Sequence, residues 1–116
     1  MLIPATKVFL NAYATDLRKS YQTLSSLVQE HFDEDPLSGA MFIFYNRSVN
    51  RLKILYWHIN GLCLWQKRLE KGSFKLPSFP KGSAKISVTS YQLQGLMQGL
   101  DCWQVKEAKP LNYRHF

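Results

Sequence analysis

One stretch of the sequence decides the fold: NRLKILYWHINGLCLWQKRLE, residues 50–70. Two runs of strand-forming residues, Leu52 to Ile59 and Leu62 to Leu69, stand on either side of Asn60-Gly61. Asparagine followed by glycine tolerates the positive φ angles of a two-residue type I′ turn, which makes it a strong hairpin signal. The stretch therefore predicts a central β-hairpin with its turn at Asn60 and Gly61.

The N-terminal half predicts two strands and a helix. Lys7 to Tyr13 is rich enough in β-branched and aromatic residues for a short strand. From Asp16 to His31 apolar residues recur at steps of three and four, which predicts an amphipathic helix with Thr15 or Asp16 as N-cap. Met41 to Tyr45 is a continuous apolar run, typical of a strand that is buried on both faces.

The C-terminal half predicts a loop, a short strand and a second helix. Gly72 to Ser83 is rich in glycine, proline and serine, which favours a loop, and Lys85 to Val88 suits a short strand. Thr89 or Ser90 then caps a helix, which Gly95 and Gly99 are expected to weaken. The tail from about Cys102 shows neither helical nor strand periodicity in its apolar residues.

These elements predict an α+β fold, with an antiparallel sheet built around the central hairpin and packed with two helices. The 116 residues fit a single domain, which we expect to span residues 1–116 with a weakly structured tail from about residue 102. No apolar run is long enough to cross a bilayer, and the N-terminus lacks the layout of a signal peptide. We therefore expect a cytoplasmic protein.

The charge is strongly positive and unevenly spread. Fifteen Lys and Arg against eight Asp and Glu give a net charge of +7. Nine of the basic residues but only one acid, Glu70, fall between Arg47 and Lys85. A one-sided positive field attracts polyanions through counterion release, although a solvated basic surface without a ligand has the same composition.

Two places concentrate this charge. The predicted hairpin sets Lys53 opposite Arg68, a like-charge pair that costs stability, and sets Arg51 opposite Glu70. Arg18 and Lys19 would lie in the first turn of the first helix, where the macrodipole favours anions, so they suit a phosphate site. In both places the alternative is a charge that merely points into water.

The sequence contains no recognisable catalytic or metal-binding motif. HExxH, CxxC and a glycine-rich phosphate loop are all missing, and the acids are clustered in one loop or isolated. Cys63 and Cys102 have no ligand-like spacing, so we expect two free thiols. We therefore expect no enzyme, no metal and no cofactor.

Four separate segments carry a family resemblance: residues 16–21 (DLRKSY), residues 35–39 (DPLSG), residues 50–57 (NRLKILYW) and residues 60–74 (NGLCLWQKRLEKGSF). They resemble the accessory protein that insertion sequences of the IS66 family encode beside their transposase, often called Orf2 or TnpB. The last two form the most specific stretch, and the likeness covers about residues 8–101. Ser20, Asn50 and Tyr56 depart from the pattern, because the family commonly has glycine, aspartate and tryptophan there. The RNA-guided nuclease that is also called TnpB is a different protein, and none of its motifs occurs here.

The resemblance implies help with transposition, alongside a separate transposase that cuts and joins DNA. We expect a non-catalytic DNA-binding factor, associated with the bacterial nucleoid, whose partners are transposon ends and that transposase. The residues predicted to contact phosphates are all basic: Arg18, Lys19, Arg47, Arg51, Lys53, Lys67, Arg68 and Lys71. The alternative is a protein–protein adaptor that docks on the transposase through Trp57 and Trp65 without contacting DNA.

Overall fold

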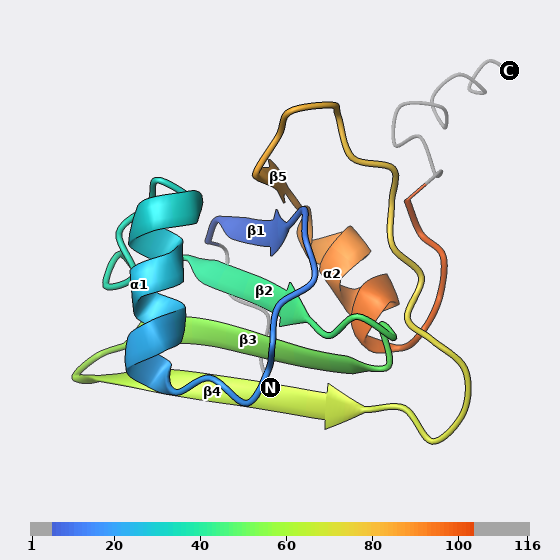
Figure 1. The fold of residues 1–116 in the computed structure, drawn as a ribbon, viewed down its shortest axis with the longest axis horizontal. Coiled ribbons are helices and arrows are strands. Elements are labelled where there is room, and N and C mark those ends of the chain that lie inside the picture. The colour runs from blue at the N-terminus through green and yellow to red at the C-terminus, as the bar shows by residue number, and fades with distance from the viewer. Residues whose placement is uncertain (1–5, 104–116) are drawn as a thin grey trace, which may run out of the picture.

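The computed structural model describes residues 6–103 and contains five strands and two helices (Figure 1). In chain order these are β1 (Val8–Asn11), α1 (Tyr21–His31), β2 (Met41–Tyr45), β3 (Arg51–His58), β4 (Gly61–Arg68), β5 (Lys85–Ser87) and α2 (Ser90–Met97). The predicted C-terminal tail lies outside the described residues from residue 104 onward. Its first two residues, Cys102 and Trp103, are half-buried.

All five strands form one sheet in the order β4-β3-β2-β1-β5. β2, β3 and β4 make an antiparallel meander, and β5 pairs antiparallel with β1. β1 and β2 are parallel, because α1 carries the chain back to the same end of the sheet between them. The α+β class is confirmed, while the sheet is mixed rather than purely antiparallel.

The two helices cover opposite faces of the sheet. Leu24 and Val28 of α1 are buried against Phe42 and Phe44 of β2 in one core cluster, which Leu55 completes. α2 lies behind the sheet in Figure 1 and packs in a second cluster with the alternate residues of the same strands. β2 is buried along its whole length because it contributes to both clusters, as its continuous apolar run predicted.

α1 begins five residues later than predicted. Ser20 is its N-cap and accepts a hydrogen bond from the Thr23 N–H at 3.3 Å. Asp16 instead accepts the Arg18 N–H at 3.0 Å, in a turn that precedes the helix, and Leu17 is buried in the core. The chain thus crosses the sheet on the side of α1 before the helix starts (Figure 1). The predicted start at Asp16 and the predicted caps Thr15 and Asp16 are wrong, and neither Arg18 nor Lys19 lies in the first turn.

The hairpin turn lies one residue earlier than predicted. Ile59 and Asn60 form it, and Gly61 already pairs with His58 as the first residue of β4. Ile59 takes a φ of 57°, which β-branched residues avoid, and its side chain is 79% exposed. The predicted turn at Asn60 and Gly61 is therefore wrong.

Each residue of β3 consequently faces a residue of β4 two positions earlier than predicted. Arg51 faces Arg68 and Lys53 faces Gln66, so the predicted pairs of Lys53 with Arg68 and of Arg51 with Glu70 are wrong. A shift by two residues leaves every side chain on the sheet face that the sequence predicted, because successive side chains alternate between faces.

The observed register places apolar residues opposite one another in the middle of the hairpin. The observed pairing sets Leu55 opposite Leu64 and Ile54 opposite Trp65. The predicted register would have set Leu55 opposite Gln66. Cross-strand apolar pairs each contribute roughly 0.2 to 1 kcal/mol, so these two pairs help to stabilise the observed register.

α2 matches its predicted start. Thr89 is the N-cap and forms a capping box with Gln92, whose side chain accepts the Thr89 N–H at 3.0 Å. Gly99 lies just beyond the helix with a φ of 80° and ends it. Gly95 is buried, and a Cβ there would lie 2.3 Å from Sγ of Cys102, so glycine is required for the chain after α2 to pack.

Candidate nucleic-acid interface

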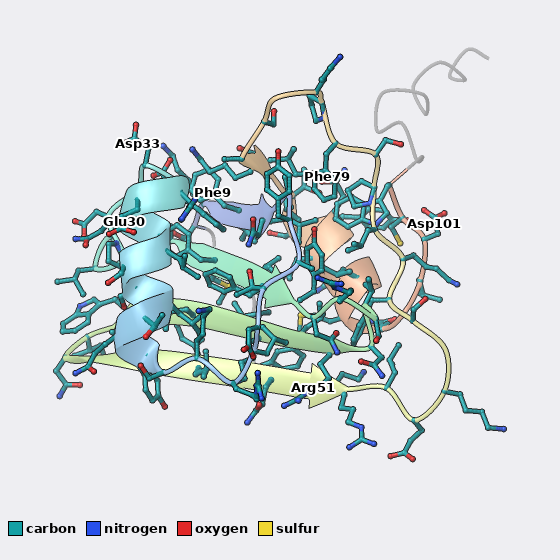
Figure 2. All side chains as sticks on the ribbon, in the orientation of Figure 1. Phe9, Glu30, Asp33, Arg51, Phe79 and Asp101 are labelled. Atoms are coloured by element: carbon teal, nitrogen blue, oxygen red, sulfur yellow. The ribbon has the colours of Figure 1, made fainter. Side chains whose placement is uncertain are left out.

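Three arginines surround one hollow at the open end of the hairpin, on the face of the sheet that α1 covers. The hollow has a volume of about 320 Å³ and is open to solvent. We call it the arginine hollow, and its lining comprises Ala14, Thr15, Asp16, Leu17, Arg18, Asn46, Arg47 and Arg51. Arg51 comes from the start of β3, as labelled in Figure 2, while Arg47 and Arg18 come from two separate loops.

The loop between β2 and β3 is held rigid by Asn46. Its Oδ1 accepts the backbone N–H groups of both Asn50 and Arg51 at 3.0 Å, and its Nδ2 donates to Oδ1 of Asn50 at 2.6 Å. Val49 closes the same loop with a φ of 53°. Because Arg47 lies inside this loop and Arg51 directly follows it, Asn46 sets the positions of both backbones.

The opposite wall of the hollow is attached to the sheet as well. The Thr15 N–H donates to the carbonyl of Tyr45, at the end of β2, at 2.8 Å. Nδ2 of Asn11 donates to Oγ1 of Thr15 at 2.9 Å and fixes the start of the same segment. Asn46 and Thr15 were not among the predicted site residues, although polar residues beside a predicted strand end are a recognised turn signal.

A fourth arginine adjoins the arginine hollow. Arg68 pairs with Arg51 across the hairpin, so the two side chains start from opposite positions on the same face of the sheet. Like charges directly opposite one another in a sheet are destabilising. Within residues 6–103 the ion pairs are Arg18 with Asp16 and Lys85 with Glu34, so neither Arg51 nor Arg68 is balanced by an acid there.

Asp16 is the single acid in the lining of the arginine hollow. Nε and Nη2 of Arg18 donate to its two carboxylate oxygens at 3.0 and 2.9 Å. The side-chain hydrogen bonds from Arg18, followed by its backbone N–H, hold the pKa of Asp16 well below its usual range. Three guanidinium groups against one ionised carboxylate leave a net charge of +2 around the hollow.

Three other acids lie away from the arginine hollow. Figure 2 shows Glu30 and Asp33 at the end of α1 that is remote from Arg51, and Asp101 beyond α2. Glu70 follows β4 at the open end of the hairpin, so one acid accompanies the four arginines there.

Comparison with known proteins identifies the family of the chain. Residues 6–107 match the family described as IS66 Orf2 like protein. The chain belongs to the IS66 Orf2-like family. The resemblance found in the sequence is confirmed, and membership implies an accessory role in an insertion sequence.

Two relatives of this IS66 Orf2-like chain come from Sinorhizobium fredii. The uncharacterized protein y4hO is 36% identical over 95 residues, which cover 82% of this chain and 81% of the relative. The uncharacterized protein y4jC is 31% identical over 105 residues, which cover 90% of this chain and 87% of the relative. No solved structure matches the chain significantly.

Asn50 shows how the IS66 Orf2-like fold accommodates one departure from the family pattern. The family often has aspartate there, and Asn50 uses its Oδ1 as the acceptor for Nδ2 of Asn46. A carboxylate oxygen accepts the same hydrogen bond. The exchange therefore preserves the loop that positions Arg47 and Arg51.

The lysines among the predicted phosphate contacts are placed differently from the arginines. Nζ of Lys53 donates to the carbonyl of Leu17 beneath the segment that leads to α1. Nζ of Lys67 donates to the carbonyl of Met97, the last residue of α2, at 2.8 Å on the other face of the sheet. Both ammonium groups thus hold parts of the fold together.

Lys19 and Lys71 complete the predicted set. Lys19 is half-buried and lines a neighbouring hollow, whereas Lys71 is exposed in the loop after β4. The structure thus brings Arg18, Arg47 and Arg51 together, and sets the other predicted residues beside or away from them.

The two tryptophans of the predicted docking surface lie on opposite faces of the hairpin. Trp57 pairs with Leu62 on the side of α1, while Trp65 packs against the core cluster on the side of α2. Both side chains are half-buried. A single flat partner surface cannot cover both of them at once.

Residues 6–103 contain neither a cluster of metal ligands nor a membrane-spanning helix. No three His, Cys, Asp or Glu side chains within this range converge as metal ligands would. Neither helix described there is long and apolar enough to cross a membrane.

Proposed function

We propose that the protein binds DNA without cleaving it and assists the separate transposase of its insertion sequence. The observation that carries this proposal is the arginine hollow with Arg68 beside it. Guanidinium groups suit phosphate oxygens, since each presents several N–H donors in one plane. The loop backbones that carry these arginines are already fixed by hydrogen bonds. Binding of a phosphodiester backbone therefore costs less conformational entropy than it would with flexible loops.

The phosphate contacts are Arg18, Arg47, Arg51 and Arg68 in this proposal. Lys19 and Lys71 flank them and add to the positive field. Lys53 and Lys67 contribute less to binding than the sequence analysis predicted, because their ammonium groups already donate to backbone carbonyls.

The same lining supports a non-catalytic role. Phosphoryl transfer by two metal ions needs carboxylates that converge on the scissile phosphate. The lining of the arginine hollow contains only Asp16, and Arg18 occupies both of its oxygens. These groups position a phosphate but provide neither a base nor a pair of metal ligands.

Fluorescence anisotropy with a labelled transposon-end duplex and a scrambled duplex of equal length tests the proposal. Four phosphate contacts predict that the logarithm of the affinity falls with the logarithm of the salt concentration with a slope of about −3 to −4. Tighter binding to the transposon end than to the scrambled duplex would add sequence recognition.

Absence of binding to either duplex at low salt would remove the proposal and favour the adaptor. Co-purification with the transposase after nuclease treatment measures that second candidate directly. A complex that survives the nuclease depends on protein contacts, and a complex that dissociates depends on DNA.

A further inference from the structure

A second hollow adjoins the arginine hollow. It lies between α1 and the segment after β1 and has a volume of about 330 Å³. Ala14, Thr15 and Asp16 line both hollows, so the two share one wall. We call the second one the tyrosine hollow, because Tyr13 is 63% exposed in its lining.

The lining of the tyrosine hollow suits a flat, partly polar ring. Leu27 and Phe32 form apolar parts of the wall, and Lys19 and His31 add polar groups. Its volume is at the lower end of the range for small-molecule sites, roughly 300 to 1,000 Å³. A site of this size has room for one ring system with its sugar rather than for a folded partner.

Tyr13 is held in place despite its exposure. Its backbone N–H donates to Oδ1 of Asn11 at 3.1 Å, and Asn11 also donates to Thr15 within the shared wall. The neighbouring Ala12 N–H donates to the carbonyl of Ala84 at 2.9 Å. An exposed aromatic side chain on an anchored backbone is an available stacking platform for a base.

The shared wall restricts what fills both hollows. The ligand must carry an anionic group for the arginine hollow and a ring for the tyrosine hollow, joined by a short linker. Asp16 lies between them, but Arg18 compensates its charge. A nucleotide within a DNA strand meets this requirement, because its sugar joins an anionic phosphate to a flat base.

We propose that the two hollows together bind one unpaired nucleotide of a DNA strand, with its phosphate on the arginines and its base against Tyr13. In a duplex the bases are stacked and paired, so a duplex reaches only the arginine hollow. The protein therefore prefers DNA with frayed or single-stranded nucleotides to intact duplex. This inference rests on the proposed function and names the form of DNA that the site recognises.

The test compares three labelled DNAs by anisotropy at one salt concentration: a blunt duplex, the same duplex with a short single-stranded thymidine overhang, and that duplex with an abasic overhang. The thymidine overhang is expected to bind about tenfold more tightly than the blunt duplex, since stacking one base on an aromatic ring has this order of effect. The abasic overhang carries the same phosphates and is expected to lose most of that gain.

Variants connect the gain to the tyrosine hollow. Tyr13→Ala is expected to abolish the preference for the thymidine overhang, measured as the ratio of its affinity to that of the blunt duplex, while Tyr13→Phe keeps the preference. Tyr91→Ala is the matched control, because Tyr91 is similarly exposed, at 56%, and belongs to α2 on the opposite face. Its preference should equal that of the unaltered protein.

Equal binding of thymidine and abasic overhangs would overturn the inference and leave the proposed function intact, since charge alone would then explain the affinity. Failure to bind any of the three DNAs would remove the proposed function itself. Competition by thymidine monophosphate as effective as that by the overhang would show that a free nucleotide is the ligand, and would overturn the assignment to a DNA strand.

Discussion

Basic side chains have different partners at the arginine hollow and at the two helix C-termini. Arg47 and Arg51 lie at an open hollow without an acid partner among residues 6–103. Lys85 instead donates to the carbonyl of Phe32, the C-cap of α1, at 2.5 Å, and Lys67 donates to the last residue of α2. Cations at helix C-termini stabilise the carbonyls that have no intrahelical partner.

This difference shows that net charge overstates the surface that can bind a polyanion. The +7 of the whole chain includes ammonium groups that hold the fold together. Counterions leave the DNA where a cation of the protein reaches a phosphate, and an ammonium group held on a backbone carbonyl is less available for that contact. We therefore expect the arginines to bind DNA and the lysines to stabilise the fold. Four experiments test this difference.

The largest effect is expected from Arg47→Ala combined with Arg51→Ala. Hydrogen bonds to charged groups contribute roughly 1.5 to 3 kcal/mol each, so the Kd for duplex DNA should rise about 100-fold. The salt slope should become shallower by about two phosphates. Anisotropy titrations at several salt concentrations measure both quantities.

The matched control for that double variant is Lys75→Ala combined with Lys81→Ala, which removes the same charge from the exposed loop after β4. It is expected to change the Kd only a few-fold. Equal losses for the two double variants would break the comparison, because overall charge would then decide the affinity.

Lys53→Met is expected to act on stability. It keeps the length of the side chain but leaves the part-buried carbonyl of Leu17 without its donor, which costs about 1 to 2 kcal/mol. Urea unfolding measures the loss, with Lys75→Met as an exposed lysine control. The dependence of DNA affinity on salt concentration should be the same as in the unaltered protein. A weaker salt dependence with unchanged stability would show that Lys53 contacts a phosphate.

Smaller losses are expected from the lysines at the helix C-termini. Lys67→Met and Lys85→Met should each lower the free energy of unfolding by about 0.5 to 1 kcal/mol, the usual size of a cation at a helix C-terminus. The effect of Lys85 should decrease at high salt, because its ion pair with Glu34 is partly exposed. Stability unaffected by either substitution would show that these hydrogen bonds are incidental.

The smallest effect has the opposite sign. Arg68→Thr removes the like-charge pair with Arg51 and should raise the free energy of unfolding by about 0.5 kcal/mol, more at low salt than at high salt. The same variant should bind DNA less tightly. Gln66→Thr, on the same face of β4, is the control, and a destabilised Arg68→Thr protein would mean that the two arginines do not repel each other.

Sequence reasoning succeeded where the signal is local and repetitive. The apolar run of residues 41–45 predicted a strand buried on both faces, and Thr89 was among the predicted caps of α2. It failed at the start of α1, where the helical period of residues 16–20 competes with a turn at Asp16 and with the burial of Leu17. Helical periodicity alone does not show where a helix begins, because tertiary contacts can hold its first predicted residues in another conformation.

The candidate site was predictable in composition but not in geometry. Arg18, Arg47, Arg51 and Arg68 were all selected from charge and from the family resemblance. Their convergence was not, since it depends on the hairpin register and on a loop that Asn46 holds. Tyr13 carried no signal of its own, because an aromatic residue at the end of a predicted strand is usually part of the core.

The sequence by itself determined the α+β class, the order of the strands along the chain, the sheet face of each hairpin side chain and the family. These properties follow from turn residues, from the two periodicities and from ordered motifs, which all act over short distances along the chain. Only the tertiary structure decided which cations are available to a ligand. Lys67 and Met97 are thirty positions apart, and Lys53 and Leu17 are thirty-six, so their hydrogen bonds exist only after the sheet and its two helical layers have packed.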